Sequence, residues 1–411
     1  MKILQINNCH YRRGGADVVY LNTGELLKKN GHEVVYFSQK NDKNLPCEDE
    51  QYFIDQIDFF QKSFFQKLLS IPRFLYSKDV ARKLEALIKE KKPDITHIHT
   101  YRGTLTPSIL VILKKYNIPT VFTLHDYELL CPHNSFFDGK GKICTKCLDS
   151  NNSLHCVLNK CNKNNIFYST ISTFDFFFHK YFIPFKKYFS QFIPVSKFNK
   201  ELHARRKEYN DKLTHLYNFF PDLNSIVPQY SKGSYFLYYG RLSYEKGIIT
   251  LLNAWKKLDS ECTLKIVGDG PQKEEILSFI KENKLDNVHC LGFKQKSELS
   301  EIINNASYII VPSEWYENNP LTIVESYSYG KPVIAAKVGG ITEIMVNNNT
   351  GYLFNMKDFS ALADTIILAN NISEKEYLNL SKNAREFAEK HFSQDSHYQA
   401  LMDIYKNTIK T

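Results

Sequence analysis

The fold of this chain is constrained most strongly by an alternation of short apolar runs and amphipathic stretches, which occurs in two separate series along the sequence. The first series contains apolar runs near 2–7, 34–37, 94–97, 119–124 and 191–195. The second contains runs near 235–239, 263–267, 288–291, 308–311 and 332–335. Runs of this length separated by helical periodicity predict parallel sheets covered by helices on both faces. We therefore predict an α/β protein with two Rossmann-like domains.

The two series are separated by a linker at 218–234, which is rich in proline, serine and glycine and has no clear periodicity. We expect an N-terminal domain at 1–220, interrupted by a Cys-rich insert at 131–161. A C-terminal domain is expected at 221–390. The remaining stretch, 391–411, closes a segment with helical periodicity and no further strand signal, so we expect a terminal helix there.

Charge is distributed unevenly between the two halves, although the whole chain carries a net charge of +9. Residues 1–220 hold 33 Lys and Arg against 21 Asp and Glu, and residues 221–411 hold 20 against 23. A basic half suggests an anionic partner, either a membrane surface, a phosphorylated acceptor or nucleic acid. A composition that is simply rich in Lys and Asn would give the same imbalance.

Two stretches at 59–73 and 174–189 interleave aromatic and basic residues. Such stretches can place rings at the headgroup level and lysines on anionic lipid, so we favour an anionic membrane surface over nucleic acid as the partner. Helices whose aromatic faces are buried against the sheet would show the same pattern. For most of these aromatic residues we expect burial.

The composition also limits the compartment and the class of protein. With 43% hydrophobic and 24% charged residues, the chain is an ordinary globular protein. No uncharged apolar run reaches the roughly 18 residues that a membrane-spanning helix needs, and the N-terminus lacks the apolar core of a signal peptide. We expect a cytoplasmic protein that is held peripherally at the inner face of the membrane.

Five of the nine cysteines fall within the insert, including a C-x-x-C pair. In a cytoplasmic chain this spacing favours metal binding over disulfides. We predict one structural zinc ion held by four thiolates, with a fifth cysteine as the substitute ligand. The four ligands are Cys144, Cys147, Cys156 and Cys161, and the substitute is Cys131. The alternative is a group of reduced thiols packed beneath a loop.

Two loops of the second series have the composition of a phosphate site. In the segment 240–247, Arg241 and Lys246 flank a loop that leads into a helix, whose N-terminus favours an anion. The next strand ends in Gly268-Asp269-Gly270-Pro271, where glycines allow the backbone to approach a ligand. A diphosphate would fit at this edge of the sheet.

A third loop carries two carboxylates eight positions apart, Glu317 after a strand and Glu325 about one turn into the next helix. A carboxylate can accept hydrogen bonds from two sugar or ribose hydroxyls, so the two groups can hold different parts of one ligand. Between them, the backbone of Asn319–Leu321, in which Pro320 has no N–H, can supply donors from the helix N-terminus.

Taken together, these motifs resemble those of the family 4 glycosyltransferases of the GT-B fold. The residues that carry the resemblance are Gly14-Gly15, His125-Asp126-Tyr127 and the segments 240–247, 268–271 and 317–325. The resemblance implies two Rossmann-like domains facing a central cleft, with the C-terminal helix crossing back to the first domain. It also implies a retaining enzyme that moves a sugar from a nucleoside diphosphate, bound by the second domain, to an acceptor bound mainly by the first.

The resemblance also implies roles for single residues. Arg241 and Lys246 resemble the diphosphate-binding pair, which replaces the divalent cation that other transferases hold with Asp-x-Asp, so we expect no catalytic metal. Glu317 resembles the residue at the donor sugar, Glu325 the ribose ligand, and His125 the histidine near the reacting face of the sugar. The remaining donor-binding residues by this resemblance are Gly14, Gly15, Asp269, Gly270, Asn318, Asn319, Pro320 and Leu321.

Fixed cations aimed at the departing diphosphate would lower the barrier to glycosyl transfer. We favour the family's front-face route, in which the leaving phosphate takes the acceptor's proton, over Glu317 as a covalent nucleophile. The segment His97-Ile98-His99 ends a strand, where the two histidines either contact the acceptor or pack into the loop.

The function that follows is a sugar transferase of bacterial surface polysaccharide assembly, acting on a saccharide or lipid-linked saccharide. Three alternatives keep the same fold: a phosphorylase, a nucleotide-sugar epimerase, and a non-catalytic zinc-containing assembly protein. The combination of the 240–247 loop with the two glutamates argues against the epimerase.

Overall fold

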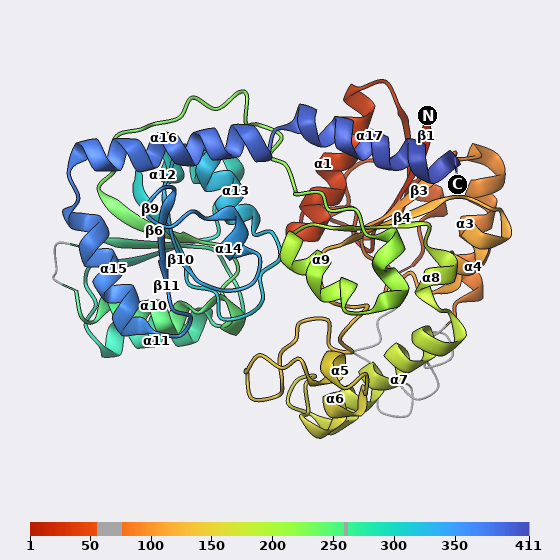
Figure 1. Cartoon of the computed structure of the whole chain (residues 1–411), viewed down its shortest axis with the longest axis horizontal. Helices are drawn as coiled ribbons and strands as arrows, with labels where there is room; N and C mark the ends of the chain where they lie inside the picture. The colour runs from red at the N-terminus through yellow and green to blue at the C-terminus, as the bar shows by residue number, and fades with distance from the viewer. Residues whose placement is uncertain (56–75, 259–261, 411) are drawn as a thin grey trace. The chain divides into compact units, whose positions relative to one another are not determined.

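The computed structural model describes residues 1–55, 76–258 and 262–410, and the chain divides into two compact units (Figure 1). The first unit comprises Met1–Lys140, Cys144–Leu216 and His397–Thr411. The second comprises Gly141–Ile143 and Tyr217–Ser396. The main division therefore falls between Leu216 and Tyr217, beside the linker at 218–234.

The first unit is built on a five-stranded parallel sheet with the order β2-β1-β3-β4-β5. Its strands are β1 (Lys2–Ile6), β2 (Glu33–Phe37), β3 (Ile95–Ile98), β4 (Thr120–Leu124) and β5 (Gln191–Pro194). Nearly every strand residue is buried, because helices cover both faces of the sheet. The sequence predicted all five of these strands.

The helices of this unit alternate with the strands and continue through the Cys-rich insert. They are α1 (Gly15–Lys29), η1 (Glu50–Tyr52), α3 (Lys78–Lys91), α4 (Ser108–Lys115), α5 (Lys146–Asp149), α6 (Leu154–Leu158), α7 (Ile166–Phe182), α8 (Phe185–Tyr188), α9 (Lys197–Ala204) and η2 (Lys207–Lys212). Helix α3 was not predicted, although Ser77 caps its N-terminus by accepting a hydrogen bond from Val80 N. The aromatic and basic stretch at 59–73 lies outside the described residues.

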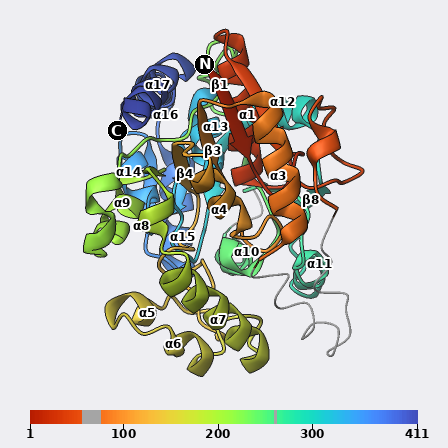
Figure 2. The same ribbon diagram turned by 90° about the vertical axis from the view of Figure 1, so that its right-hand side faces the viewer.

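The end of the chain returns to the first unit, as predicted. Helix α17 (Gln394–Lys410) runs beside the first sheet, as the ribbon in Figure 2 shows. Its residues Leu401, Met402 and Tyr405 pack into a cluster with Ile3 of β1 and other residues of the first unit. The segment of helical periodicity that the stretch 391–411 closes is not one continuous helix, because α16 (Glu374–His391) ends before α17 begins. Apolar periodicity alone did not reveal this break.

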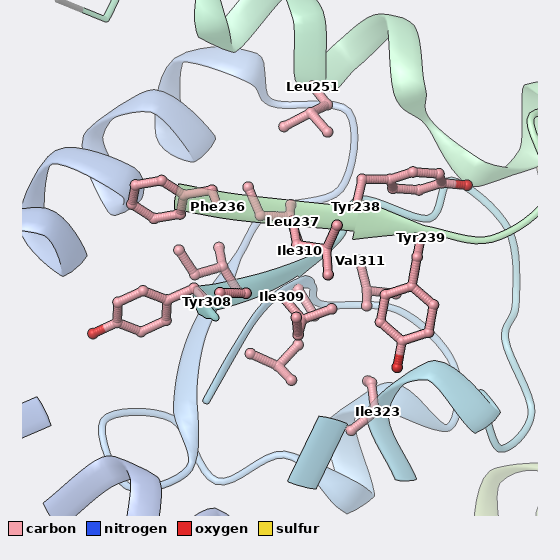
Figure 3. Packing of buried hydrophobic residues seen from close by; sticks show 14 of the residues in the cluster. Phe236, Leu237, Tyr238, Tyr239, Leu251, Tyr308, Ile309, Ile310, Val311 and Ile323 are labelled. Atoms are coloured by element: carbon pink, nitrogen blue, oxygen red, sulfur yellow. The ribbon is translucent and has the colours of Figure 1, made fainter. Parts of the chain in front are cut away.

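The second unit contains a six-stranded parallel sheet with the order β11-β10-β9-β6-β7-β8. Its strands are β6 (Tyr235–Tyr239), β7 (Leu264–Val267), β8 (Val288–Gly292), β9 (Ala306–Val311), β10 (Val333–Ala336) and β11 (Gly351–Phe354). Aromatic and branched side chains of the central strands β6 and β9 fill the core against the neighbouring helices (Figure 3). Strand β11 is an addition to the predicted set.

Helices alternate with the strands of the second sheet along the chain, as in a doubly wound unit, and two more helices follow the last strand. They are η3 (Tyr244–Lys246), α10 (Ile248–Trp255), α11 (Lys273–Glu282), α12 (Lys296–Asn304), α13 (Leu321–Ser328), α14 (Ile341–Ile344), α15 (Phe359–Asn371) and α16. Nowhere in the described part of the chain is a helix long and apolar enough to cross a bilayer.

Candidate functional site

The loops after β6 and β7 pack backbone against backbone. Leu242 N donates to Asp269 O at 2.9 Å, and Gln272 N donates to Leu242 O at 3.0 Å. A Cβ added at Gly268 would lie 1.9 Å from Gly240 O, and one at Gly270 would lie 2.3 Å from Leu242 O. Both glycines are therefore required by the approach of the two loops, which meet at the carboxyl edge of the sheet where parallel sheets bind ligands.

Lys246 and Glu317 form the centre of this edge. The Lys246 ammonium lies 2.6 Å from Glu317 Oε1, and Ser313 Oγ donates to the same oxygen at 2.6 Å. Glu317 is buried, which opposes its ionisation, but the Lys246 ammonium and the hydrogen bonds that the carboxylate accepts lower its pKa below the ordinary value. The pair is thus an ionised couple at neutral pH, joining the loops after β6 and β9.

Arg241 lies on the same loop as Lys246, after β6, and Asp269 lies on the loop after β7. The Arg241 side chain is exposed, so its guanidinium can move to meet an anion without breaking a buried contact. Asp269 Oδ1 accepts a hydrogen bond from Gly270 N at 2.8 Å, which shapes the turn after β7. The indole of Trp315 stacks beneath the Lys246 ammonium, 5.3 Å from the ring centroid.

Two contacts that the sequence did not predict hold the loop that carries Glu317. Gly340 N donates to Glu317 O at 2.7 Å, and a Cβ at Gly339 would lie 2.5 Å from that oxygen. Asn218 N donates to Asn319 Oδ1 at 3.0 Å. Glu317, Asn318 and Asn319 are all buried, and Pro320 leads into α13, so the predicted segment 317–321 forms one rigid turn at the start of this helix.

Glu325 lies one turn into α13 and is only partly buried. Burial raises its pKa to about 7, although a hydrogen bond with Tyr239 acts in the opposite direction. Tyr239 Oη also lies 3.0 Å from Thr322 O. A carboxylate in this position can accept hydrogen bonds from a polyol, which would favour its ionised form.

The raised pKa of Glu325 leads to a stability prediction. The folded protein binds this proton up to about pH 7, whereas the unfolded chain releases it near 4.5, so stability falls as pH rises between these values. Glu325→Gln removes the titrating group, and we expect it to raise the free energy of unfolding at pH 8 by about 2 kcal/mol, allowing for partial exposure. Urea unfolding of the native protein and the variant at pH 5 and pH 8 measures this difference in the free energy of unfolding. An equal difference at the two pH values would contradict it.

Gly14, Gly15 and His125 belong to the first unit, so they form a separate group. Gly14 is the N-cap of α1, and its carbonyl accepts a hydrogen bond from Val18 N at 3.0 Å. His125 directly follows β4. Both positions lie at the carboxyl edge of the first sheet, because α1 follows the loop after β1 and the strands are parallel.

His97 and His99 are buried, with exposed fractions of 2% and 1%. Their rings stack 4.3 Å apart, and both make hydrogen bonds within the unit. Of the two interpretations left open by the sequence, packing within the unit is the one that the structure shows. Direct contact of these side chains with an acceptor is therefore not expected.

Three of the five cysteines of the insert come close together. Cys147, Cys156 and Cys161 form a buried cluster, Asn159 Nδ2 lies 3.6 Å from Cys144 Sγ, and all are free thiols. Burial raises the pKa of Cys147 to about 12, and neighbouring cysteines add to the shift. Among residues 1–55, 76–258 and 262–410, no three His, Cys, Asp or Glu side chains are arranged to hold a metal ion.

Several site residues were missed at the sequence level. Ser313 lies two residues after the end of β9, so its place near the carboxyl end of a central strand was a usable signal. Tyr239 likewise ends β6. Gly339 and Gly340 follow β10, and only the packing of their loop under Glu317 reveals their role.

The second unit thus offers a mobile guanidinium, a fixed ammonium, a rigid glycine-lined turn and two carboxylates at one sheet edge. Cations placed in this way stabilise phosphate oxygens, and carboxylates bind the hydroxyls of sugars. The arrangement suits a ligand that joins a phosphate group to a polyol.

Two family models together match most of this chain. The family model for Glycosyltransferase Family 4 matches residues 13–221, and that for Glycosyl transferases group 1 matches residues 221–387. An uncharacterized glycosyltransferase of Methanocaldococcus jannaschii is 31% identical over 43% of this chain, and the match spans 50% of that relative's length. An uncharacterized protein of the cps region of Klebsiella pneumoniae is 23% identical over 92% of this chain and 96% of its own.

Among solved structures, Anabaena HepE in complex with UDP and glucose superposes with a TM-score of 0.72 and 17% identity, covering 99% of this chain and 100% of that one. At this level of identity the likeness concerns the fold, which is GT-B with two Rossmann-like units. Since one family model covers half of the sequence and a second covers most of the rest, this chain belongs to glycosyltransferase family 4.

Proposed function

We propose that this protein is a retaining glycosyltransferase of bacterial surface polysaccharide biosynthesis, which transfers a sugar from a nucleoside diphosphate to a saccharide or lipid-linked saccharide. The observation that carries the proposal is the ionised Lys246–Glu317 couple beside the exposed Arg241, at the sheet edge formed by the loops after β6, β7 and β9. Relatives support it: HepE was solved with UDP and glucose, and the Klebsiella relative is a protein of the cps region.

In this proposal, Arg241 and Lys246 bind the diphosphate and stabilise the charge that grows on it as the glycosidic bond breaks. Glu317 contacts the donor sugar together with Asn318 and Asn319. Leu321, which follows Pro320, supplies a backbone N–H donor, as do Gly14, Gly15 and Asp269 at the phosphates and ribose, where Gly270 allows a close approach. Glu325 binds the ribose hydroxyls. His125 lies at the reacting face of the sugar. Two cationic side chains take the place of a catalytic metal.

The test is a panel of nucleotide sugars incubated with the purified full chain, with release of the nucleoside diphosphate as the readout. We expect one or two donors to be hydrolysed slowly in the absence of acceptor, and turnover to persist in EDTA. With acceptor present, proton NMR of the product should show the anomeric configuration of the donor. An inverted product would contradict the retaining mechanism, and the absence of turnover with every donor would contradict the proposed function.

We further propose that the protein works in the cytoplasm, bound peripherally to an anionic membrane surface. The predicted stretch at 174–189 supports this in part, because its aromatic residues divide into two sets. Phe176, Phe185 and Phe189 are buried, as expected for most of them. Phe177 and Phe182 of α7 have exposed fractions of 46% and 66%.

Exposed rings on α7 lie close in sequence to exposed lysines, Lys186 and Lys187 of α8. The first half of the chain also carries the excess of positive charge. Rings at the headgroup level with nearby cations favour anionic lipid, at about 1 kcal/mol per cation near the surface.

The double variant Phe177→Ser/Phe182→Ser should lose binding to anionic vesicles in cosedimentation, and binding of the native chain should weaken as salt rises through the physiological range. The matched control is Ile367→Ser/Leu368→Ser, which removes two exposed apolar side chains of α15 in the second unit. Equal and negligible binding of the native chain to neutral and anionic vesicles at low salt would contradict a membrane partner.

We also propose that the Cys-rich insert binds one structural zinc ion through Cys144, Cys147, Cys156 and Cys161, with Cys131 as the substitute. The buried cluster of Cys147, Cys156 and Cys161, in a stretch of sequence that holds five cysteines, supports this. The thiols are not arranged around a common point in the structure, so binding requires the side chains to turn and lose their protons.

Elemental analysis of protein produced with zinc present is expected to find about one equivalent per chain. Cys147→Ser should abolish zinc content, whereas Cys290→Ser, in β8 of the second unit, should leave it unchanged. A folded and active preparation without zinc would show that the cysteines are packed thiols.

A further inference from the structure

The loop at 240–247 is joined to the core of the second unit by a tyrosine hydroxyl. Tyr238 is the last residue but one of β6, has an exposed fraction of 3%, and donates from Oη to Arg241 O at 2.8 Å. Between these two residues, Gly240 has φ of +149°, which lets the chain turn back toward the hydroxyl. The hydroxyl therefore ties the peptide group that follows Arg241 to a residue of the core.

The ring of Tyr238 is held by close packing. Strand β6 lies between β9 and β7 in the second sheet, and Tyr238 belongs to the hydrophobic cluster of this unit. Tyr238 and Tyr239 point to opposite sides of the strand, as neighbouring strand residues do (Figure 3). Tyr239 Oη donates to Thr322 O at 3.0 Å, so it contacts α13, whereas Tyr238 contacts the loop after β6. A side chain packed in this way transmits the rigidity of the core to the loop.

The Tyr238 hydroxyl is a hydrogen-bond donor at neutral pH. Burial raises the pKa of Tyr238 above its ordinary value, and the negative charges of Glu317 and Glu245 add to this shift. The phenol therefore keeps its proton. A backbone carbonyl can only accept, so the bond between Tyr238 and Arg241 O has a defined direction.

Arg241 combines an exposed side chain with a fixed backbone. Its carbonyl oxygen accepts hydrogen bonds from Tyr238 Oη and, at 3.1 Å, from Ser243 N. The next residue, Leu242, is buried and bonded to the loop after β7. When an anion binds the guanidinium, the side chain has to be ordered but the backbone does not, which lowers the entropic cost of binding. Loss of the Tyr238 bond would add backbone freedom to that cost.

We propose that Tyr238 is a positioning residue of the donor site, whose hydroxyl fixes the backbone of Arg241 and thereby holds the guanidinium ready to bind the diphosphate. The inference rests on the proposed function, since it takes Arg241 to bind a diphosphate. Tyr238 and Arg241 both belong to the second unit, so the role is defined within that unit alone. Tyr238 acts through Arg241 and needs no contact with the ligand.

The experiment compares Tyr238→Phe with Tyr235→Phe in the full chain. Both substitutions keep the ring and remove only the hydroxyl. Tyr235 lies on the same strand with an exposed fraction of 6%, and its Oη donates to Ile302 O at 2.7 Å, so the control removes the same kind of bond. The probe is inorganic pyrophosphate, whose affinity is measured by calorimetry. Hydrogen exchange of residues 240–247 without ligand and thermal unfolding are measured in parallel.

We expect Tyr238→Phe to lower the affinity for pyrophosphate about fivefold, the scale of one lost hydrogen bond, and Tyr235→Phe to leave it unchanged. Exchange of the amides of 240–247 should be faster in Tyr238→Phe only, while both variants should unfold at similar temperatures. Adding Tyr238→Phe to Arg241→Ala should lower the affinity no further, because that background has no guanidinium to position.

Three results would overturn the inference. One is an unchanged exchange of 240–247 or an unchanged affinity in Tyr238→Phe, and another is an equal loss of affinity in Tyr235→Phe. The third is a fivefold loss when Tyr238→Phe is added to Arg241→Ala, because the hydroxyl would then act on the unit as a whole. Failure of the proposed function is distinguished from these. A native chain that bound no pyrophosphate would contradict the diphosphate site, while the exchange of 240–247 would still decide whether Tyr238 fixes the loop.

Discussion

Replacing Glu317 with Ala is expected to lower donor turnover by about a hundredfold or more, the scale of losing one preorganised charged contact. The carboxylate accepts hydrogen bonds from Lys246 and Ser313 while buried at the sheet edge. Its removal takes away the group that we propose to face the donor sugar, and it releases Lys246 from the ion pair. Arg241→Ala should act in the same direction, by leaving the growing charge on the diphosphate less stabilised.

The control for Glu317→Ala is Glu314→Ala in the same loop. Glu314 Oε1 accepts a hydrogen bond from Thr250 Oγ1 at 2.5 Å, and its other oxygen lies 3.5 Å from Lys357 Nζ, so it too is a paired carboxylate. Its substitution should change turnover far less. Steady-state assays with the native donor, together with circular dichroism to confirm folding, measure the difference. Native turnover in both Glu317→Ala and Arg241→Ala would refute the assignment of the site.

Replacing Gly268 with Ala is expected to destabilise the second unit by more than about 3 kcal/mol and to abolish donor binding. The residue has φ of +147°, and an added Cβ would lie 1.9 Å from Gly240 O. Because the obstructing atom belongs to the backbone, no side-chain rotation relieves the clash. The loops after β6 and β7 would have to separate, and this would displace the groups that we propose to hold the diphosphate.

Gly292→Ala is the matched control for this substitution. Gly292 also has a positive φ, +68°, but an added Cβ would meet nothing within 4 Å. It should therefore cost only the backbone strain, about 1 kcal/mol. Urea unfolding gives both free energies, and nucleotide binding is measured by calorimetry. If the two variants were equally stable, the close packing of the loops would not be the reason for glycine at 268.

Local patterns in the sequence were sufficient for the architecture. Alternating apolar runs and helical periodicity predicted two parallel sheets, because a sheet buried on both faces has apolar residues at nearly every strand position. The same patterns located the candidate loops at 240–247, 268–271 and 317–325, since ligand loops follow strands at the carboxyl edge. Strand β11 was not predicted because it is short and starts at a glycine of φ +144°. Helix α3 was also not predicted, although its N-cap residue, Ser77, can be recognised in the sequence.

Contacts between residues far apart in the chain were decided by the tertiary structure. Lys246 and Glu317 are 71 positions apart, and their ion pair depends on the adjacency of β6 and β9, which sequence order does not reveal. His97 and Tyr405 are 308 positions apart and meet only because α17 returns to the first sheet. Periodicity and glycine content are local properties, whereas a pairing between distant side chains depends on strand order and helix docking.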